Sequence, residues 1–163
     1  MASLATIGVY GFDAAGFLAA LRAADVALAL DVRQRRGVRG PQYSWANSLR
    51  LQELLAQAGI GYRHEPTLAP TTELRHLQYR EDDRLGVGKR SRTLLADAYR
   101  DRYTREILDR ADLDAIAAAF PASGATALLC VERDPQACHR GLAAARIAER
   151  FGLALTHLRP AAD

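Results

Sequence analysis

The stretch Leu128-Leu-Cys-Val-Glu-Arg-Asp-Pro-Gln-Ala-Cys-His-Arg140 combines a buried-strand pattern with a dense group of reactive side chains. Its apolar first half predicts a strand over residues 125–131 that ends in polar residues. Asp134-Pro135 then predicts a helix start, with the carboxylate as cap and proline at the first helical position. We therefore expect a strand, a tight turn and a helix whose first turn carries a thiol, an imidazole and a guanidinium.

The rest of the chain alternates short apolar strands with amphipathic helices. Strands are expected at 4–9, 26–32, 60–64 and 153–158, and helices at 14–23, 45–58, 71–77, 94–107 and 113–120. The polar stretch 80–92 is expected to be mobile. Such alternation predicts an α/β fold. We expect a single three-layer, Rossmann-like domain over residues 1–163, with a mostly parallel sheet of about five strands and helices on both faces.

Composition limits the class of protein and its location. The 163 residues are 49% hydrophobic and 25% charged, which is ordinary for a globular protein with its own core. No apolar run approaches the roughly 20 residues of a membrane span. The first residues lack the pattern of a signal peptide, and the chain has two cysteines. We therefore expect a cytoplasmic protein with reduced thiols and no membrane contact.

Three of the predicted strands end in residues whose side chains can bind a ligand or take part in a reaction. These ends are Val9-Tyr10-Gly11, Asp31-Val32-Arg33 and Cys130-Val131-Glu132. In open parallel sheets, ligands bind beyond the carboxyl ends of the strands, near the point where the strand order reverses. The three ends together therefore predict the position of a binding site.

Four residues are the candidates for catalysis there. Cys138 and His139 lie in the first turn of the predicted helix, where the helix dipole favours a thiolate; Cys138 is either a nucleophile or a small core residue. Asp31 and Glu132 either form an acid and base pair or each orient an arginine. Cys130 lies within an apolar run, so we expect it to serve packing. The spacing of the cysteines and His139 matches no zinc signature, so we expect no metal and no cofactor, while a disulfide between the cysteines stays open.

The residues between the second strand and the next helix form the best anion-binding cluster of the chain. This loop, 33–39, holds four arginines, and guanidinium groups suit phosphate and carboxylate. The segment 86–90 is similar to a phosphate-binding loop but lacks its leading glycine and a preceding strand. The residues expected to bind the substrate are Arg33, Arg39, Arg140, Tyr10 and His64.

Short motifs recur along nearly the whole chain in a fixed order. They are Thr6-Ile7-Gly8, Asp31-Val32-Arg33, Gly59-Ile60-x-Tyr62, Leu68-Ala69-Pro70-Thr71-x-Glu73-Leu74-Arg75 and Leu129-Cys130-x-Glu132 followed by Cys138-His139-Arg140. With these motifs the chain resembles the family named domain of unknown function 488 (DUF 488), in a branch marked by Leu-Ala-Pro-Thr. The resemblance implies a compact α/β domain with the pocket placed as above. It implies no reaction.

Three functional hypotheses follow. The first is an enzyme acting on a small anionic substrate, such as a nucleotide, in a pocket at the strand carboxyl ends. The second is a nucleic-acid-binding module, which the modest net charge of +3 makes the weaker alternative. The third is a non-catalytic regulatory or redox-sensing domain that uses Cys138. The sequence does not predict the substrate or the oligomeric state.

Overall fold

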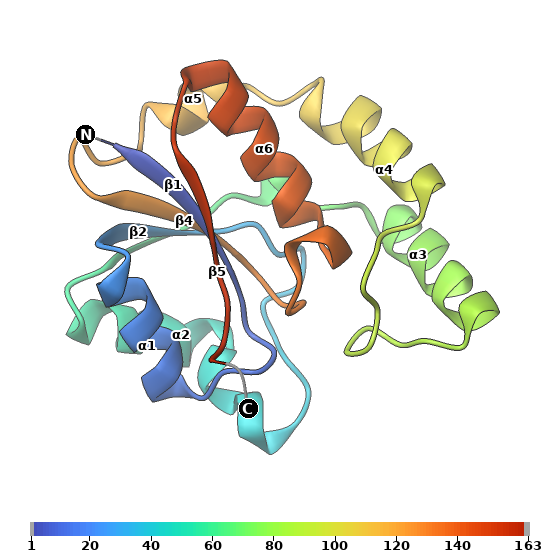
Figure 1. The fold of residues 1–163 in the computed structure, drawn as a ribbon, viewed down its shortest axis with the longest axis horizontal. Coiled ribbons are helices and arrows are strands. Elements are labelled where there is room, and N and C mark those ends of the chain that lie inside the picture. The colour runs from blue at the N-terminus through green and yellow to red at the C-terminus, as the bar shows by residue number, and fades with distance from the viewer. Residues whose placement is uncertain (1, 162–163) are drawn as a thin grey trace.

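A five-stranded parallel sheet forms the centre of the molecule (Figure 1). The computed structural model describes residues 2–161. The strands are β1 (Ser3–Gly8), β2 (Val26–Asp31), β3 (Gly61–His64), β4 (Ala125–Cys130) and β5 (Leu155–Leu158), and their order in the sheet is β3-β2-β4-β1-β5. All four strand pairs are parallel. Leu129 lies opposite Ile7 of β1 and Asp31 of β2, so the three central strands end at the same edge.

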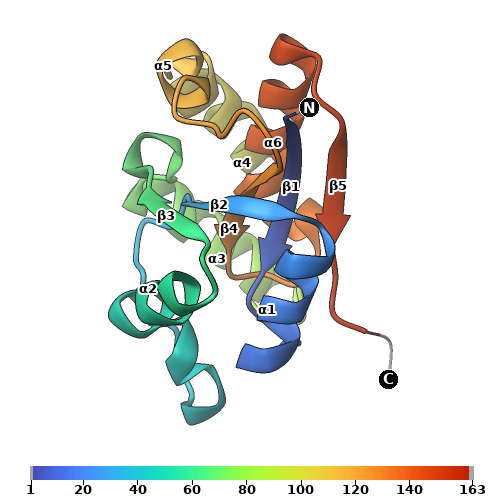
Figure 2. The ribbon, with the colours of Figure 1, turned by 90° about the vertical axis from the view of Figure 1, so that its left-hand side faces the viewer.

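Helices cover both faces of this sheet (Figure 2). One face carries α1 (Ala14–Ala23) and α2 (Ser48–Gln57), and the other carries α4 (Asp97–Tyr103), α5 (Leu113–Ala117) and α6 (His139–Phe151). The helix α3 (Thr72–Leu85) packs beside α4. The expected three-layer α/β fold is therefore confirmed.

The central strand β4 is buried along its whole length. Because successive strand residues point to opposite faces, Leu128 and Cys130 pack with the α4–α6 side, whereas Ala127 and Leu129 pack with α1 and α2. A strand covered on both faces has a continuous apolar run as its sequence pattern. This burial explains why the run at 125–131 predicted its strand correctly.

The structure corrects the expected start of the last helix. Residues Pro135–Ala137 form a short 3₁₀ turn, and α6 begins only at His139. The reason is the backbone of Cys138, which is extended at φ −141° and ψ 144° and so interrupts the helix. Asp134 is not a cap; its carboxylate accepts a hydrogen bond from Arg159 at 2.8 Å. Cys138 thus lies at the N-cap of α6.

Three other helices differ from the sequence expectation. The helix expected over 94–107 begins only at Asp97 and continues after Tyr103 as a π-helical turn, Thr104–Leu108. The short helix expected to end at residue 77 continues as α3 to Leu85, where Gly86 closes it in the left-handed conformation (φ 72°), so the first part of the stretch expected to be mobile is helical. The helix expected over 45–58 is split at Asn47, whose extended backbone separates a 3₁₀ turn from α2. The Asn47 side chain instead accepts a hydrogen bond from the Val38 amide at 2.7 Å.

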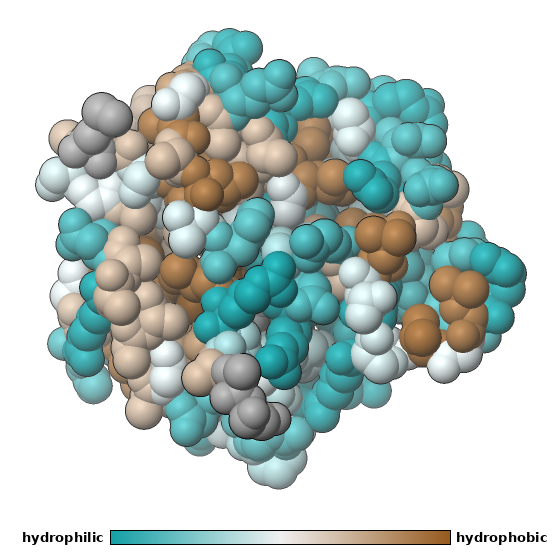
Figure 3. All heavy atoms as spheres, in the orientation of Figure 1, coloured by the Kyte–Doolittle hydropathy of each residue, from teal (hydrophilic) through white to brown (hydrophobic). Residues whose placement is uncertain are grey.

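Apolar side chains are scattered over the surface. The large exposed ones are Leu49, Leu85 and Leu94, which belong to separate segments of the chain. On the face shown in Figure 3, hydrophobic residues occur in small groups among hydrophilic ones. None of the helices within residues 2–161 has both the length and the apolar character needed to span a bilayer.

Candidate functional site

A cavity of about 940 Å³ lies at the carboxyl ends of β1, β2 and β4. Its wall combines Tyr10 after β1, the arginine loop after β2, residues 130–132 at the end of β4, one side of α3 and the segment 88–92. The helix after β4 covers one face of the sheet, and the helices after β1 and β2 cover the other. The connections that leave neighbouring strands at this edge therefore run to opposite faces of the sheet. In open α/β sheets, a crevice that binds ligands lies at such a point.

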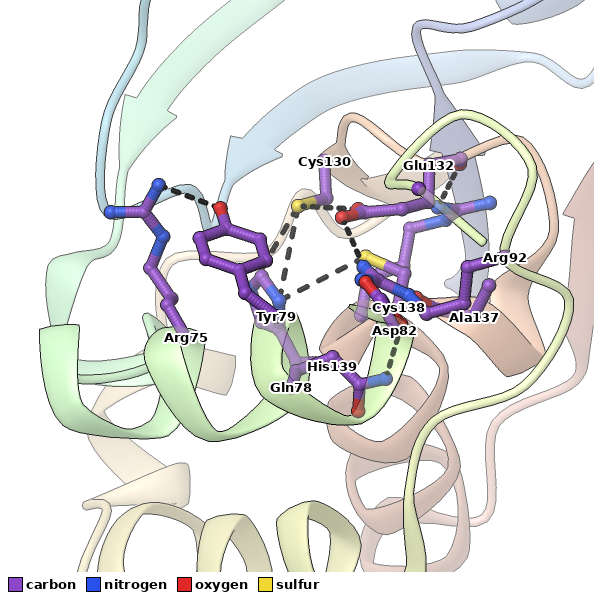
Figure 4. A network of polar contacts seen from close by, with 12 residues as sticks. Arg75, Gln78, Tyr79, Asp82, Arg92, Cys130, Glu132, Ala137, Cys138 and His139 are labelled. Carbon is purple, nitrogen blue, oxygen red and sulfur yellow. Dashed lines mark hydrogen bonds and ion pairs between the residues drawn. The ribbon is translucent and has the colours of Figure 1, made fainter. Parts of the chain in front are cut away.

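The floor of the cavity holds two thiols and an imidazole. The Sγ atom of Cys130 lies 3.9 Å from both ring nitrogens of His139, and the Sγ atom of Cys138 lies 3.8 Å from its Nδ1. His139 Nε2 is 2.8 Å from the carbonyl oxygen of Val32. Because a carbonyl oxygen only accepts, Nε2 carries a proton, and Nδ1 is the ring nitrogen near Cys138 (Figure 4).

Burial and charge act in opposite directions on the two thiols. Burial alone would raise the pKa of Cys138, but the hydrogen bond from Cys130 and the positive charges of His139 and Arg140 outweigh it and hold that pKa well below its ordinary value. Burial and the negative charge on Cys138 raise the pKa of Cys130 well above its ordinary value. Burial would lower the pKa of His139, but the Cys138 thiolate raises it. The pKa values of the two thiols are therefore shifted in opposite directions, downward for Cys138 and upward for Cys130.

A buried ionic bridge supports Glu132 beside this cluster (Figure 4). Arg92 donates to Glu132 Oε1 at 2.8 Å and to Asp82 Oδ2 at 2.6 Å. Gln78 donates to the other Asp82 oxygen at 2.8 Å, and Glu132 Oε2 lies 3.7 Å from Cys130 Sγ. Burial raises the pKa of Glu132, as does the Cys138 thiolate, while Lys89 and Arg92 oppose them. The bridge thus connects α3 and the segment before α4 to the end of β4.

This bridge was not predicted from the sequence, although α3 carries a signal of it. Leu74, Gln78 and Asp82 are all buried, and they are spaced by four, so that they lie on one face of the helix. Polar residues that continue an apolar stripe indicate a buried polar contact, because unpaired polar groups are costly inside a protein. The partner, Arg92, was assigned to a mobile stretch.

Arg90 holds the segment 88–92 beside the cavity, and Lys89 of the same segment lines it. The Arg90 guanidinium lies 5.2 Å from the ring centre of Tyr10 and 5.3 Å from that of Tyr43, within cation–π range. Burial would lower the pKa of Lys89, but Glu132 and Cys130 outweigh it and raise that pKa. Lys89 therefore brings a full positive charge to the cavity, a contribution that the sequence analysis did not predict.

The residues predicted as site residues fall into two groups. Those that line the cavity are Tyr10, Arg33, Arg39, Glu132, Cys138 and His139. Cys130, predicted to serve packing, is buried as expected and also lines the cavity. Asp31, His64 and Arg140 lie outside the lining. The cavity therefore brings six of the predicted residues together, while its use as a functional site and the roles of the single residues stay predictions.

Asp31 and Arg33 form a buried pair at the end of β2. The Asp31 carboxylate accepts from Arg33 Nε at 2.9 Å and Nη2 at 2.8 Å, and from the Tyr62 hydroxyl at 2.6 Å. The Arg33 guanidinium also donates to the carbonyl oxygen of Ala46 at 2.9 Å. His64 Nε2 lies 2.9 Å from the carbonyl oxygen of Arg33. These contacts hold the start of the arginine loop against β3 and the 3₁₀ turn before α2, so Asp31 and His64 position the loop.

Arg140 holds the loop after β4. Its guanidinium, which is fully buried, donates to the carbonyl oxygens of Glu132 and Arg133. Gly8 lies against the carbonyl group of Glu132. A Cβ atom added at Gly8 would come within 1.8 Å of the Glu132 carbonyl oxygen. The Gly8 and Arg140 positions of the two terminal motifs therefore act together to aim Glu132 at the cavity.

Fold and site together define a small α/β protein with a cationic cavity at the carboxyl edge of a parallel sheet. The family model described as "Domain of unknown function DUF488" matches residues 13–147, so the chain belongs to this family. Comparisons with curated proteins and with solved structures gave no significant match.

Proposed function

We propose that this protein is an enzyme that acts on a small anionic molecule, such as a nucleotide, bound in the cavity. The observation that carries the proposal is the charge of the cavity wall. Seven lining residues are cationic, and among the described residues Glu132 alone contributes a carboxylate. Arg33 and Arg92 are buried and Arg75 and Lys89 are half-buried, whereas Arg35, Arg39 and Arg90 are exposed. The charges of the first four act more strongly, because the local dielectric constant is lower than that of water.

Five of the seven cations have no carboxylate partner in the ion pairs of residues 2–161. They are Arg35, Arg39, Arg75, Lys89 and Arg90. Arg33 and Arg92 are already paired with carboxylates, and Arg90 stacks on two tyrosines. Arg75 is held by hydrogen bonds to Gln34 and Tyr79 at 2.9 and 3.0 Å. The free cations surround a volume that suits a drug-sized or nucleotide-sized ligand.

Glu132 and the Cys130–Cys138–His139 cluster supply the chemical groups of the proposed enzyme. Arg92 fixes one oxygen of Glu132, and the other points to the cluster. A carboxylate held in this way beside a bound anion is placed for proton transfer. The cations would bind the substrate, and the groups on the floor would act on it.

A binding screen tests the proposal. Titration calorimetry of the wild type with phosphate, pyrophosphate, AMP and ATP is expected to show binding of at least one of these anions. Lys89→Met is expected to weaken that binding tenfold or more, because a charge-assisted hydrogen bond contributes about 1.5–3 kcal/mol. Arg22→Met, an exposed position on α1, is the control and is expected to bind as the wild type does.

The same ligand separates an enzyme from a binding protein. Product formation, followed by NMR, is expected with the wild type. Glu132→Gln is expected to bind the ligand but to form product at least about 100-fold more slowly. Absence of binding, or equal affinities of Lys89→Met and Arg22→Met, would contradict the proposal. Binding of a DNA or RNA oligonucleotide in place of all four small anions would favour the nucleic-acid-binding hypothesis.

A further inference from the structure

We propose that Cys130, Cys138 and His139 bind one zinc ion at the floor of the cavity. The three ligand atoms lie within 4.8 Å of one another, and all three side chains are buried. They come from the end of β4 and the start of α6, on either side of the 3₁₀ turn. The sequence predicts no metal here because the spacing fits no zinc signature; the fold creates the cluster.

One ring nitrogen of His139 is already held, which leaves the other for a metal. The Nε2 proton is donated to the Val32 carbonyl oxygen at 2.8 Å, and Nδ1 lies 3.8 Å from Cys138 Sγ. Cys130 Sγ is 3.9 Å from both nitrogens, so the ring would turn slightly to present Nδ1 to an ion between the two sulfurs. Histidines that bind metals almost always donate their second ring N–H to a carbonyl, a carboxylate or water, which fixes the ring and its tautomer. The hydrogen bond to Val32 thus prepares Nδ1 for an ion.

The distances in the cluster are close to those of a tetrahedral zinc site. Zn–S bonds of about 2.3 Å and Zn–N bonds of about 2.0–2.1 Å place sulfur and nitrogen about 3.6 Å apart in a tetrahedron. The observed distances from His139 Nδ1 are 3.8 Å to Cys138 and 3.9 Å to Cys130. The third pair, the two Sγ atoms, lies within 4.8 Å, compared with about 3.8 Å in a tetrahedron, so binding of one ion would draw the two thiols together.

The ligand set selects the kind of ion and leaves one position open. Thiolates and imidazole favour zinc over magnesium and calcium, which prefer oxygen ligands. All three residues also line the cavity, so a fourth ligand would come from the cavity side. Three protein ligands with an open fourth position are typical of catalytic zinc sites. The use of this position rests on the proposed function, whereas metal binding itself does not.

Cobalt substitution tests the site without a substrate. The reduced protein, stripped with a chelator, is titrated with Co²⁺ and then with Zn²⁺. We expect one Co²⁺ per chain, with the thiolate charge-transfer and visible bands of a tetrahedral site, and loss of these bands when Zn²⁺ displaces cobalt. Zn²⁺ is also expected to protect both thiols from a disulfide reagent, since these are the two cysteines of the chain.

Variants test whether the cobalt absorption bands depend on the three proposed ligands. Cys138→Ser and His139→Asn are expected to lower the cobalt affinity at least 100-fold, while His64→Gln, a histidine outside the cavity lining, is expected to bind cobalt as the wild type does. Circular dichroism shows whether each variant is folded. If Cys138→Ser does not fold, the thiol-protection assay on the wild type decides the proposal by itself.

Two results would overturn the zinc site. One is a reduced wild type that shows no cobalt bands and keeps two reactive thiols in the presence of Zn²⁺, which would favour Cys138 as a free nucleophile or redox group. The other is unchanged cobalt binding by folded Cys138→Ser. If the protein binds cobalt as expected but none of the anions, the proposed function fails and the metal site stands. If it binds an anion but no cobalt, the metal site fails and the proposed function stands.

Discussion

Arg92→Met is expected to lower the free energy of unfolding by about 3–5 kcal/mol, the cost of leaving buried charges without their partner. Arg92 is 8% exposed and joins Asp82 to Glu132 by ion pairs of 2.6 and 2.8 Å. Methionine fills much of the same volume but supplies no charge. Both carboxylates would then lie in the interior next to each other without the guanidinium between them.

Urea denaturation followed by circular dichroism measures this loss. Arg84→Met is the matched control, because Arg84 lies on α3 and pairs with Glu81 at the surface, where its side chain is 67% exposed. Removal of an exposed pair is expected to cost at most about 1 kcal/mol. Equal losses in the two variants would show that the Arg92 bridge does not stabilise the fold as its burial indicates.

Gly8→Ala is expected to cost about 3 kcal/mol or to prevent folding, because its new methyl group has no room. The Cβ atom would lie 1.8 Å from the carbonyl oxygen of Glu132 and 2.9 Å from Arg140 Nη1. The Glu132 carbonyl group belongs to the backbone, so it cannot turn away as a flexible side chain could. Backbone hydrogen bonds from Val9 to Cys130 at 3.2 Å and from Tyr10 to Val131 at 2.9 Å hold this part of the chain in place. The carboxyl ends of β1 and β4 would have to move apart, and the cavity at these ends would be distorted.

Gly88→Ala is the control for Gly8→Ala. A methyl group added at residue 88 would have no atom within 4 Å, and the backbone there is not in the left-handed region. The change in stability is expected to be under about 1 kcal/mol and can be positive, because alanine restricts the unfolded chain. Thermal unfolding of both variants makes the comparison. A Gly8→Ala protein as stable as Gly88→Ala would contradict the close approach of β1 and the loop after β4.

The fold was predictable because its signals are local. The continuous apolar run of β4 and the alternation of strands and helices follow from side-chain periodicity. The false helix start at Asp134-Pro135 was also a local inference: capping preferences fit those residues, but the extended Cys138 overrides them. That extended residue is what separates the turn from α6 and places the thiol beside His139.

The candidate site was predictable in position and not in its contacts. Strand ends that carry Glu132, Asp31 and Tyr10 converge because parallel strands share one carboxyl edge. The partners of these residues were not predictable in the same way. Arg92 binds carboxylates 10 and 40 residues away in the sequence, and only the tertiary fold brings α3, the segment before α4 and the end of β4 together. Asp31, by contrast, pairs with a neighbour two residues along.

The position of a bound anion tests most directly whether the cavity is the binding site. Crystals soaked in tungstate, a phosphate analogue with a strong anomalous signal, show where the protein binds such an ion. We expect an anomalous peak inside the cavity, between Lys89 and Arg75 and above the Cys130–Cys138–His139 cluster, that is lost in Lys89→Met. Peaks confined to arginines of the outer surface, with none in the cavity, would contradict the proposed site.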